Sequence, residues 1–480
     1  MSPRPISAEA FEEMVLENME DFDMSRTDAI LDTKVQCDAM SLQYSQLCFL
    51  SNGKIENPIS LDSLLCKWKL SGGSCTLYME LKTWMQDNTQ AFVQESSWFP
   101  LIWNDIQNGN DNQNGEKEEN DIQNAWTFLA WYCTLDGLNI FTENEFLQVL
   151  SSLSFLNACM KPYGYTVLRN MCLGREKVKV WWRKNQGKKI FMHAFTTILD
   201  NGEECKALSG VWRTLTVNDD VSANMSQVHD VVRDLMNDGI VTSILNMLMN
   251  FEDMPSVLAP WVLVLKQLAI TEDHCAELVK LNVVLKVQTW MQRHADHTSL
   301  LRTGISMMRN IVAADQFKSY FVHTSGMEGV LQAMDRHDAD AKIQEVGCAT
   351  LATAALRHPA LCTHMVSVGA HRAIAKALKQ HASSPANVRQ ASLALRNMVV
   401  RNPELRETIL QEQVETVLRA SQCIRDCGDE AYAALRDLGC KIQLQGAPAK
   451  AHFNPTTLQS QELHSNIDAE ARAPFSEEIY

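Results

Sequence analysis

The sequence has few of the features that mark membrane, secreted or disordered proteins. No stretch approaches the roughly 20 apolar residues that span a bilayer. The start, MSPRPISAEAFEEM, lacks the basic and apolar segments of a secretion signal. Only 13 of the 480 residues are proline, and 46% are hydrophobic, which is typical of a folded soluble protein. We therefore expect a folded chain without membrane segments, located in the cytoplasm with the nucleus as a second compartment.

Catalytic and metal-binding motifs are missing as well. The sequence contains no phosphate-binding GxxxxGK[ST], no GxSxG, no dinucleotide-binding GxGxxG and no HExxH. Its 14 cysteines are scattered, and the pair Cys423 and Cys427 has no second pair at zinc-ligand spacing. Scattered cysteines in apolar stretches indicate reduced thiols. We expect no enzymatic activity, no metal and no cofactor.

What the sequence does contain is an internal repeat. One set of anchor residues recurs every 43 or 44 positions, at Gly239, Asn282, Gly326, Gly369 and Gln413. A second set recurs at the same step, apart from one step of 53, at Asn170, Thr214, Gln267, Asn310, Thr353 and Asn397. The longer step indicates an insertion before Gly239. This period lies within the roughly 40 to 47 residues of armadillo and HEAT repeats.

The period has a physical basis. A small helical unit cannot cover its own apolar face, so such units stack and share one core. Glycine at an anchor suits a turn between two helices, because a positive φ would strain any other residue. Asp437 takes the second anchor position in a last, shorter unit.

The segments MRNIVAAD and LRNMVVRN resemble the third helix of the armadillo repeat. Near the two ends, ISAEAFEEMVLENMEDFDMSRTDAI and AYAALRDLGCKIQL resemble the animal family of armadillo-repeat-containing protein six. The expected fold is all-α, a right-handed armadillo-type superhelical solenoid of about seven to eight three-helix repeats. A flexible N-terminal region and a C-terminal tail accompany this array.

Four segments are expected along the chain. Residues 9–32 contain nine acidic residues and a single basic one, Arg26. Their apolar residues Phe11, Val15, Met19 and Phe22 follow helical spacing. This acidic amphipathic helix either covers the first apolar face of the array or docks on a partner, and we favour the first. The expected segments are the acidic N-terminal region 1–44, a poorly defined segment 45–125 with a disordered loop at 104–124, the array at 126–445 and a disordered tail at 446–480.

The armadillo resemblance implies a binding groove lined by the third helices. It carries over to Asn170, Asn310 and Asn397, whose amides could pair with the main chain of a bound segment. Neighbouring arginines would favour an acidic partner. They are Arg169, Arg213, Arg309, Arg396 and Arg436. An arginine on a helix face often only meets solvent, so this role has an ordinary alternative.

One departure concerns nuclear import. Import armadillo proteins place tryptophan four residues before the asparagine, where this chain has Thr166, Ser306 and Leu393. A groove rich in arginine would also suit basic cargo badly. The resemblance therefore does not extend to an import receptor.

A dense basic cluster lies at 175–189. Lys177, Lys179, Arg183 and Lys184 occur there beside two tryptophans, a mixture that could contact single-stranded nucleic acid. The alternative, which we favour, is the start of a repeat with buried tryptophans and solvated lysines. The net charge of -15 also repels phosphates at long range.

We expect a non-enzymatic protein-interaction scaffold that holds an extended or helical, acidic partner segment in its groove. The alternatives are a nucleic-acid-associated adaptor that uses the basic cluster and a co-chaperone-like binder of a folded domain. The sequence leaves the oligomeric state and the identity of the partner open.

Overall fold

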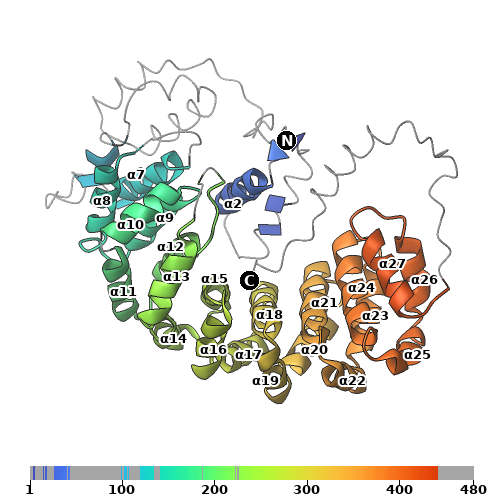
Figure 1. Cartoon of the computed structure of the whole chain (residues 1–480). Helices are drawn as coiled ribbons and strands as arrows, with labels where there is room; N and C mark the ends of the chain where they lie inside the picture. The colour runs from blue at the N-terminus through green and yellow to red at the C-terminus, as the bar shows by residue number, and fades with distance from the viewer. Residues whose placement is uncertain are drawn as a thin grey trace. The chain divides into compact units, whose positions relative to one another are not determined.

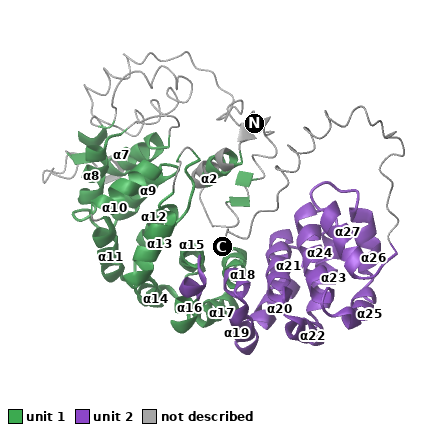
Figure 2. Cartoon of the chain, viewed as in Figure 1, with its two compact units in different colours: residues 1–269, 276–308 green, residues 270–275, 309–480 purple. Residues whose placement is uncertain are grey.

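A computed structural model describes residues 4–5, 14–15, 17–18, 26–40, 42–43, 99, 102–104, 106–107, 119–134, 141–185, 187–221, 223 and 226–441. The predicted tail at 446–480 and most of the predicted segment 45–125 lie outside the described residues. The chain forms two compact units (Figure 2). Unit 1 comprises residues 1–269 and 276–308, and unit 2 comprises residues 270–275 and 309–480.

The structure repeats a triplet of helices (Figure 1). In one triplet, α13 (Val228–Asn237) and α14 (Ile240–Leu248) form a pair, and the longer α15 (Pro255–Leu268) follows. Apolar residues of α13 at helical spacing are buried. The third helix, α15, packs on the third helix of the preceding triplet, α12 (Gly202–Leu215). Stacking of third helices on one another is how each triplet covers the apolar face of its neighbour.

Unit 1 contains a stack of third helices, α7, α9, α12 and α15, in which each packs on the next. The remaining bounds are α7 (Glu119–Tyr132), α8 (Glu143–Ser152), α9 (Lys161–Cys172), α10 (Glu176–Lys184), α11 (Gly187–Thr197), the 3-10 helix η1 (Met249–Phe251) and α17 (Val283–Arg293). Helices α16 (Glu272–Lys280) and α18 (Thr298–Ala313) each contain residues of both units.

Unit 2 repeats the pattern, with α21, α24 and α27 as successive third helices packed side by side. Its elements are η2 (Asp315–Phe317), α19 (Lys318–His323), α20 (Gly326–Arg336), α21 (Ala341–Ala355), α22 (Pro359–Ser367), α23 (Ala370–Gln380), α24 (Pro385–Val399), η3 (Pro403–Leu405), α25 (Arg406–Leu410), α26 (Val414–Ser421) and α27 (Gly428–Asp437).

The first set of anchors marks the turn before each second helix. Gly239 and Gly369 have φ of 73° and 85° there, as the repeat predicted. The anchor at Gly326 is wrong by one residue, because the left-handed position is Ser325, with φ of 57°, and Gly326 begins α20. Asn282 and Gln413 also adopt positive φ, 57° and 59°. Non-glycine residues in this region carry a steric penalty of roughly 1–2 kcal/mol each.

Helix starts use ordinary caps. In α24, Ser384 accepts a hydrogen bond from the backbone of Asn387, and Pro385 occupies the first turn. In α21, Asp340 accepts from the backbone of Lys342 at 2.9 Å. Such caps satisfy amides that have no partner within the helix.

Aromatic rings fill the core between the triplets of unit 1. Phe195 of α11 stacks on Trp212 of α12, with ring centroids 5.8 Å apart, and contacts Trp261 of α15 at 5.6 Å. The indole N–H of Trp261 donates to the carbonyl of Cys205 at 3.1 Å. Trp212 and Trp261 are fully buried, and truncation of such a side chain costs about 3–5 kcal/mol.

The N-terminal region contains a helix, α2 (Arg26–Ala39), and two short parallel strands. In β1 (Arg4–Pro5) and β2 (Leu42–Gln43), Arg4 pairs with Leu42. The Nδ2 of Asn18 donates to Thr33 Oγ1 at 2.9 Å, and Gln36 Nε2 donates to Asn18 Oδ1 at 2.9 Å. Of the predicted acidic helix at 9–32, residues 14–15 and 17–18 are helical and residues 26–32 belong to α2, which continues to Ala39, while the other residues of this prediction lie outside the described part of the chain.

Another segment covers the face of α7. Trp103 packs edge-on against Trp126 of α7, with centroids 5.7 Å apart, and Phe99 stacks on Trp103. Phe99 and Trp103 therefore cover part of this apolar face, and the predicted capping of the array by the acidic N-terminal helix falls largely outside the described residues. The predicted loop at 104–124 is also too long, because α7 begins at Glu119.

Within the described part of the chain, the structure is helical apart from the two strands β1 and β2. The triplets, their stacked third helices and their turns are those of an armadillo-type solenoid, so the predicted all-α armadillo-type fold is confirmed, while the number of repeats stays a prediction. Among the described helices, none is long and apolar enough to cross a membrane.

Candidate functional site

The predicted asparagines lie in the last turns of third helices, and the amides of Asn170 and Asn397 connect neighbouring triplets. Asn170 of α9 donates from Nδ2 to the carbonyl of Ala130 in α7 at 2.9 Å. Asn397 of α24 makes the same contact with the carbonyl of Ala352 in α21, also at 2.9 Å. Each amide therefore bonds a main chain, but that of the preceding third helix of its own array.

These asparagines differ in how far their side chains are exposed to solvent. Asn170 is 3% exposed, so its amide is enclosed and does not meet a ligand in this arrangement. Asn310 and Asn397 are half-buried, and the carbonyl of Asn310 lies 3.9 Å from the Cys275 thiol. The role of Asn310 and Asn397 in holding a partner's main chain stays a prediction.

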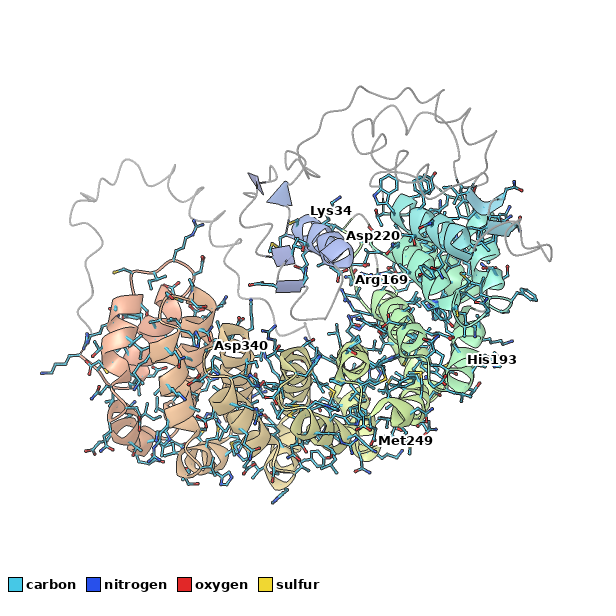
Figure 3. All side chains as sticks on the ribbon, turned by 180° about the vertical axis from the view of Figure 1, so that it is seen from behind. Lys34, Arg169, His193, Asp220, Met249 and Asp340 are labelled. Carbon is cyan, nitrogen blue, oxygen red and sulfur yellow. The ribbon has the colours of Figure 1, made fainter. Side chains whose placement is uncertain are left out.

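Two of the predicted arginines meet one carboxylate. Arg169 of α9 donates from Nη2 to Oδ1 of Asp32 at 3.0 Å, and Arg213 of α12 forms an ion pair with the other oxygen. The Asp32 side chain is 4% exposed, against 9% for Arg169 and 20% for Arg213. Asp32 belongs to α2, which lies beside the helix that carries Arg169 (Figure 3). An acidic residue of the same chain thus pairs with both of the arginines that we expected to attract an acidic partner.

A second arginine pair is built the same way in unit 2. Arg396 of α24 donates from Nε to Asp437 Oδ2 at 2.9 Å, and Arg436 of α27 donates to Oδ1 at 2.8 Å. Burial raises the pKa of Asp437, but the hydrogen bonds and charges of both arginines outweigh it, so the pKa lies below its usual value. Arg396 and Arg436 remain 38% and 55% exposed.

Arg309 occupies the equivalent position in α18 and is exposed. The sequence reasoning identified these arginines but missed the carboxylates that pair with them. The signal for Asp437 was present, because it stands at the anchor position that asparagine, threonine or glutamine occupies in other triplets. No comparable signal pointed to Asp32.

The basic cluster at 175–189 is largely structural. Trp181 and Trp182 are 9% and 2% exposed, as the favoured alternative predicted. Lys179 is 3% exposed and forms a buried ion pair with Asp219, so its assignment to a solvent-facing basic patch is wrong. Arg183 donates to Asp234 at 2.7 Å. The remaining two residues of the predicted patch, Lys177 and Lys184, are exposed. The Nζ of Lys177 lies over the Trp181 ring, 5.2 Å from the ring centroid.

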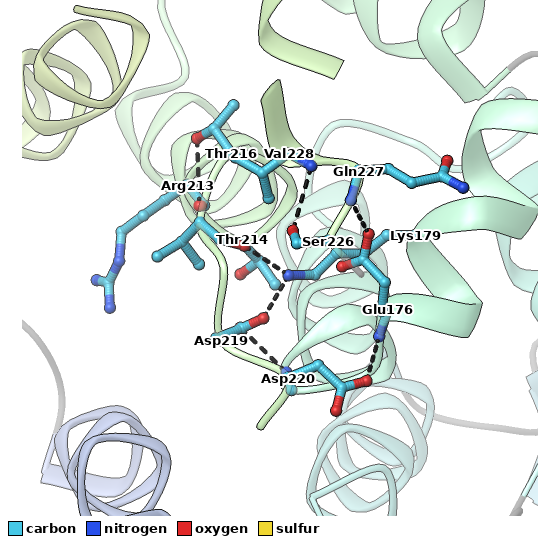
Figure 4. A network of polar contacts seen from close by, with 12 residues as sticks. Glu176, Lys179, Arg213, Thr214, Thr216, Asp219, Asp220, Ser226, Gln227 and Val228 are labelled. Atoms are coloured by element: carbon cyan, nitrogen blue, oxygen red, sulfur yellow. Dashed lines mark hydrogen bonds and ion pairs between the residues drawn. The ribbon is translucent and has the colours of Figure 1, made fainter. Parts of the chain in front are cut away.

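The insertion that lengthens one repeat supports this cluster (Figure 4). Asp219 accepts from the backbone of Gly174 at 3.0 Å, and Asp220 accepts from that of Glu176 at 2.8 Å. Glu176 in turn accepts from the backbone of Gln227 at 2.6 Å. The inserted residues therefore hold the start of α10 through acidic side chains, which leaves the basic residues partly neutralised.

The described residues contain no group of three or more histidine, cysteine, aspartate or glutamate side chains placed to hold a metal ion. Burial raises the pKa of the Cys133, Cys172 and Cys348 thiols to about 12. These thiols stay protonated at neutral pH and act as small apolar core residues.

Comparison with known proteins gives sequence relatives and a fold relative, while no protein-family model matches the chain. Armadillo repeat-containing protein 6 homolog of Drosophila melanogaster is 26% identical over 152 residues, 32% of each chain. Armadillo repeat-containing protein 6 of Pongo abelii is 24% identical over 236 residues, 47% of each chain. The human protein of that name is 26% identical over 166 residues. The matched region thus spans less than half of the length of these relatives.

The crystal structure of an engineered protein superposes with a TM-score of 0.52, covering 90% of this chain and 99% of the other at 11% identity. That likeness concerns the fold alone. Together with the sequence relatives, it agrees with the helix triplets and their 43- to 44-residue period. The chain is therefore similar to the armadillo-repeat proteins and, among them, to armadillo repeat-containing protein 6, as its third-helix segments and its two ends predicted.

Proposed function

We propose that this chain is a non-enzymatic protein-interaction scaffold whose third helices bind an acidic segment of a partner protein. The observation that carries the proposal is the arginine pair of unit 2. Arg396 and Arg436 reach the same carboxylate from neighbouring third helices, yet both guanidinium groups stay partly exposed. The similarity to armadillo-repeat proteins supports a scaffold, because solenoids of this kind bind partners along extended surfaces.

The charge balance at this pair favours an anionic ligand. Two guanidinium groups around Asp437 leave one net positive charge. Each guanidinium has five N–H donors, and Asp437 uses only some of them. An incoming carboxylate could accept the remaining donors in a bidentate pair, which is stronger than a neutral hydrogen bond.

Exposed apolar side chains lie at the ends of α24 and of the preceding third helix, α21. Val400 follows α24 and is 51% exposed, and Leu356 follows α21 and is 42% exposed. These residues occupy equivalent positions in successive triplets, one repeat apart. A partner segment that combines acidic and apolar residues, such as an amphipathic helix, would fit both the arginines and this apolar edge.

The alternatives have weaker support. The basic cluster favours nucleic acid less than the sequence suggested, because Lys179 is buried against Asp219 and Arg183 pairs with Asp234. A co-chaperone role would use a broad surface, and the structure assigns it no particular residue.

The experiment compares partners captured by the full chain and by two charge-matched double variants. Arg396→Gln with Arg436→Gln removes the pair on the third helices. Arg372→Gln with Arg425→Gln removes two exposed arginines, 73% and 87% exposed, outside the third helices. Circular dichroism first confirms that both variants fold. Proteins captured by the native chain and the control, but reduced at least about tenfold with the first variant, support the proposal. Equal capture by all three chains refutes it.

A further inference from the structure

The unit 1 arginines differ from those of unit 2 in the origin of their carboxylate. In unit 2 the carboxylate is Asp437, which follows Arg436 directly in α27. In unit 1 the residues that follow the arginines are Asn170 and Thr214, which carry no charge. The carboxylate there comes from Asp32, 137 positions before Arg169, in a helix outside the triplets.

Asp32 occupies this position as a bound ligand would. Its side chain is 4% exposed, and each of its oxygens faces a guanidinium from a different third helix. The contact is therefore a pair of charge-assisted interactions on one carboxylate, which is the chemistry expected of an acidic partner segment. Asn18, Thr33 and Gln36 bond one another, so part of the hydrogen bonding of the N-terminal region is internal to it.

We propose that Arg169 and Arg213 form a binding site for an acidic helical segment and that α2 is its resident occupant. An external acidic segment reaches these arginines only when α2 leaves. This proposal rests on the proposed function, since it assigns the same kind of partner to a second arginine pair.

The charge of Arg169 and Arg213 determines which kind of segment can take the place of α2. Arg169 is nearly buried, and removal of Asp32 without a substitute would take one counter-charge away from a poorly solvated guanidinium. An incoming segment that supplies a carboxylate at the same place would restore that charge. A neutral or basic segment lacks the group that would compensate these charges.

Covalent attachment favours α2 over a free competitor. A tethered segment acts at an effective concentration that reaches the millimolar order for a favourable linker. If α2 occupies the arginines nine-tenths of the time, the apparent Kd of an external ligand rises about tenfold. Release of α2 would thus raise affinity without any change in the arginines themselves.

The test uses the full chain and a fluorescein-labelled peptide of residues 26–40, followed by fluorescence anisotropy. Asp32→Asn in the full chain removes the carboxylate of the occupant with little change in shape. Asp200→Asn is the control, because Asp200 is an exposed residue of the same unit and the change removes the same charge. A second peptide carries asparagine in place of Asp32, which tests the site without altering the fold of the receptor.

We expect the native chain and the Asp200→Asn chain to bind the labelled peptide weakly. The Asp32→Asn chain should bind it about tenfold more tightly or better, and the peptide lacking the carboxylate should lose that gain. Equal affinity of native and Asp32→Asn chains would overturn the proposal, as would equal binding of the two peptides. Failure of the peptide to bind any chain would also overturn it.

These outcomes are separate from those of the proposed function. The double variant Arg396→Gln with Arg436→Gln tests partner capture in unit 2 and leaves Asp32, Arg169 and Arg213 unchanged. If the double variant loses partner capture while Asp32→Asn leaves peptide affinity unchanged, the scaffold is supported and only the proposal that α2 is a resident occupant is refuted. If Asp32→Asn raises peptide affinity while the double variant keeps partner capture, only the unit 2 site is refuted.

Discussion

The guanidinium of Arg169 and the carboxylate of Asp32 lie 3.0 Å apart although 137 positions separate them in the chain. Arg213, on the next third helix, pairs with the same carboxylate. The contact connects the acidic N-terminal region to two successive triplets of unit 1. A comparable arrangement around Asp437 in unit 2 uses residues of the triplets alone.

Removal of the Asp32 charge should loosen α2. An isolated helix of this length is marginally stable in water, so α2 depends on its contacts with the rest of unit 1. We expect Asp32→Asn to raise amide hydrogen exchange across residues 26–39 by about tenfold or more. Exchange in α15 should stay as in the native chain, and Asp200→Asn should change neither. Unchanged exchange in α2 would show that the ion pair does not hold it.

Glycine at the strained anchors should stabilise the protein. Ser325 and Gln413 are exposed and adopt φ of 57° and 59°, so their side chains contribute strain. Ser325→Gly and Gln413→Gly should each raise the free energy of unfolding of unit 2 by about 0.5–1 kcal/mol. Gly369→Ala should lower it by about 1 kcal/mol or more, because alanine must adopt the φ of 85° found there. Thermal unfolding followed by circular dichroism measures all three, and a loss of stability in the glycine variants would contradict the assignment.

The buried pair in the basic cluster should matter far more for stability than for binding. Lys179 and Asp219 are 3% and 4% exposed, so Lys179→Met leaves a buried carboxylate without its counter-charge. We expect a loss of about 3–5 kcal/mol in urea unfolding. Lys177→Met, at an exposed position over Trp181, should cost about 0.5 kcal/mol. Similar effects of the two variants would contradict the structural role of Lys179.

The anchors show how far the sequence determines this fold and where its information ends. A period of 43 to 44 residues was enough to predict the helix triplets, because stacking imposes the same length on each unit. The anchor was placed at Gly326, one residue too late, because glycine is the usual residue in the left-handed conformation, whereas Ser325 adopts that conformation here. Gly326 instead begins α20, where it is buried.

The binding-site residues were harder to predict for a different reason. Asn170 was expected in a groove, but it is buried and its amide bonds the carbonyl of Ala130, 40 residues away. Lys179 looked solvated because Asp219 lies on an insertion 40 residues later. Periodicity places a residue on a helix, whereas burial and pairing depend on which distant segments pack against that helix. The acidic character of residues 9–32 was visible in the sequence, but not the arginines that one of these acids meets.

His371 should make unit 2 sensitive to acid. Its side chain is 2% exposed, and neither ring nitrogen has a hydrogen-bond partner among the described residues. Burial lowers the pKa of His371, with Glu412 opposing and Arg372 adding to the effect. The folded pKa thus lies below the unfolded value of about 6.5. The contribution of neutral His371 to stability is present above that pH and is lost as the pH falls through the folded pKa.

We therefore expect the thermal midpoint of the native chain to fall more steeply between pH 7 and pH 5 than that of His371→Leu, which cannot take up the proton. Leucine has a similar volume and needs no hydrogen bond, so the variant should remain folded. Parallel pH profiles for the two chains would show that His371 does not contribute to the acid sensitivity.

The central claim is that partners bind at the ends of the third helices, and site-specific photo-crosslinking tests it most directly. A photo-reactive phenylalanine derivative replaces Val400, which is 51% exposed at the end of the helix that carries Arg396, or Arg372, which is 73% exposed on α23. We predict that the chain labelled at position 400 crosslinks a partner through a segment rich in acidic residues, while the chain labelled at 372 does not. Crosslinks at position 372 and none at position 400, under the same conditions, would contradict the account.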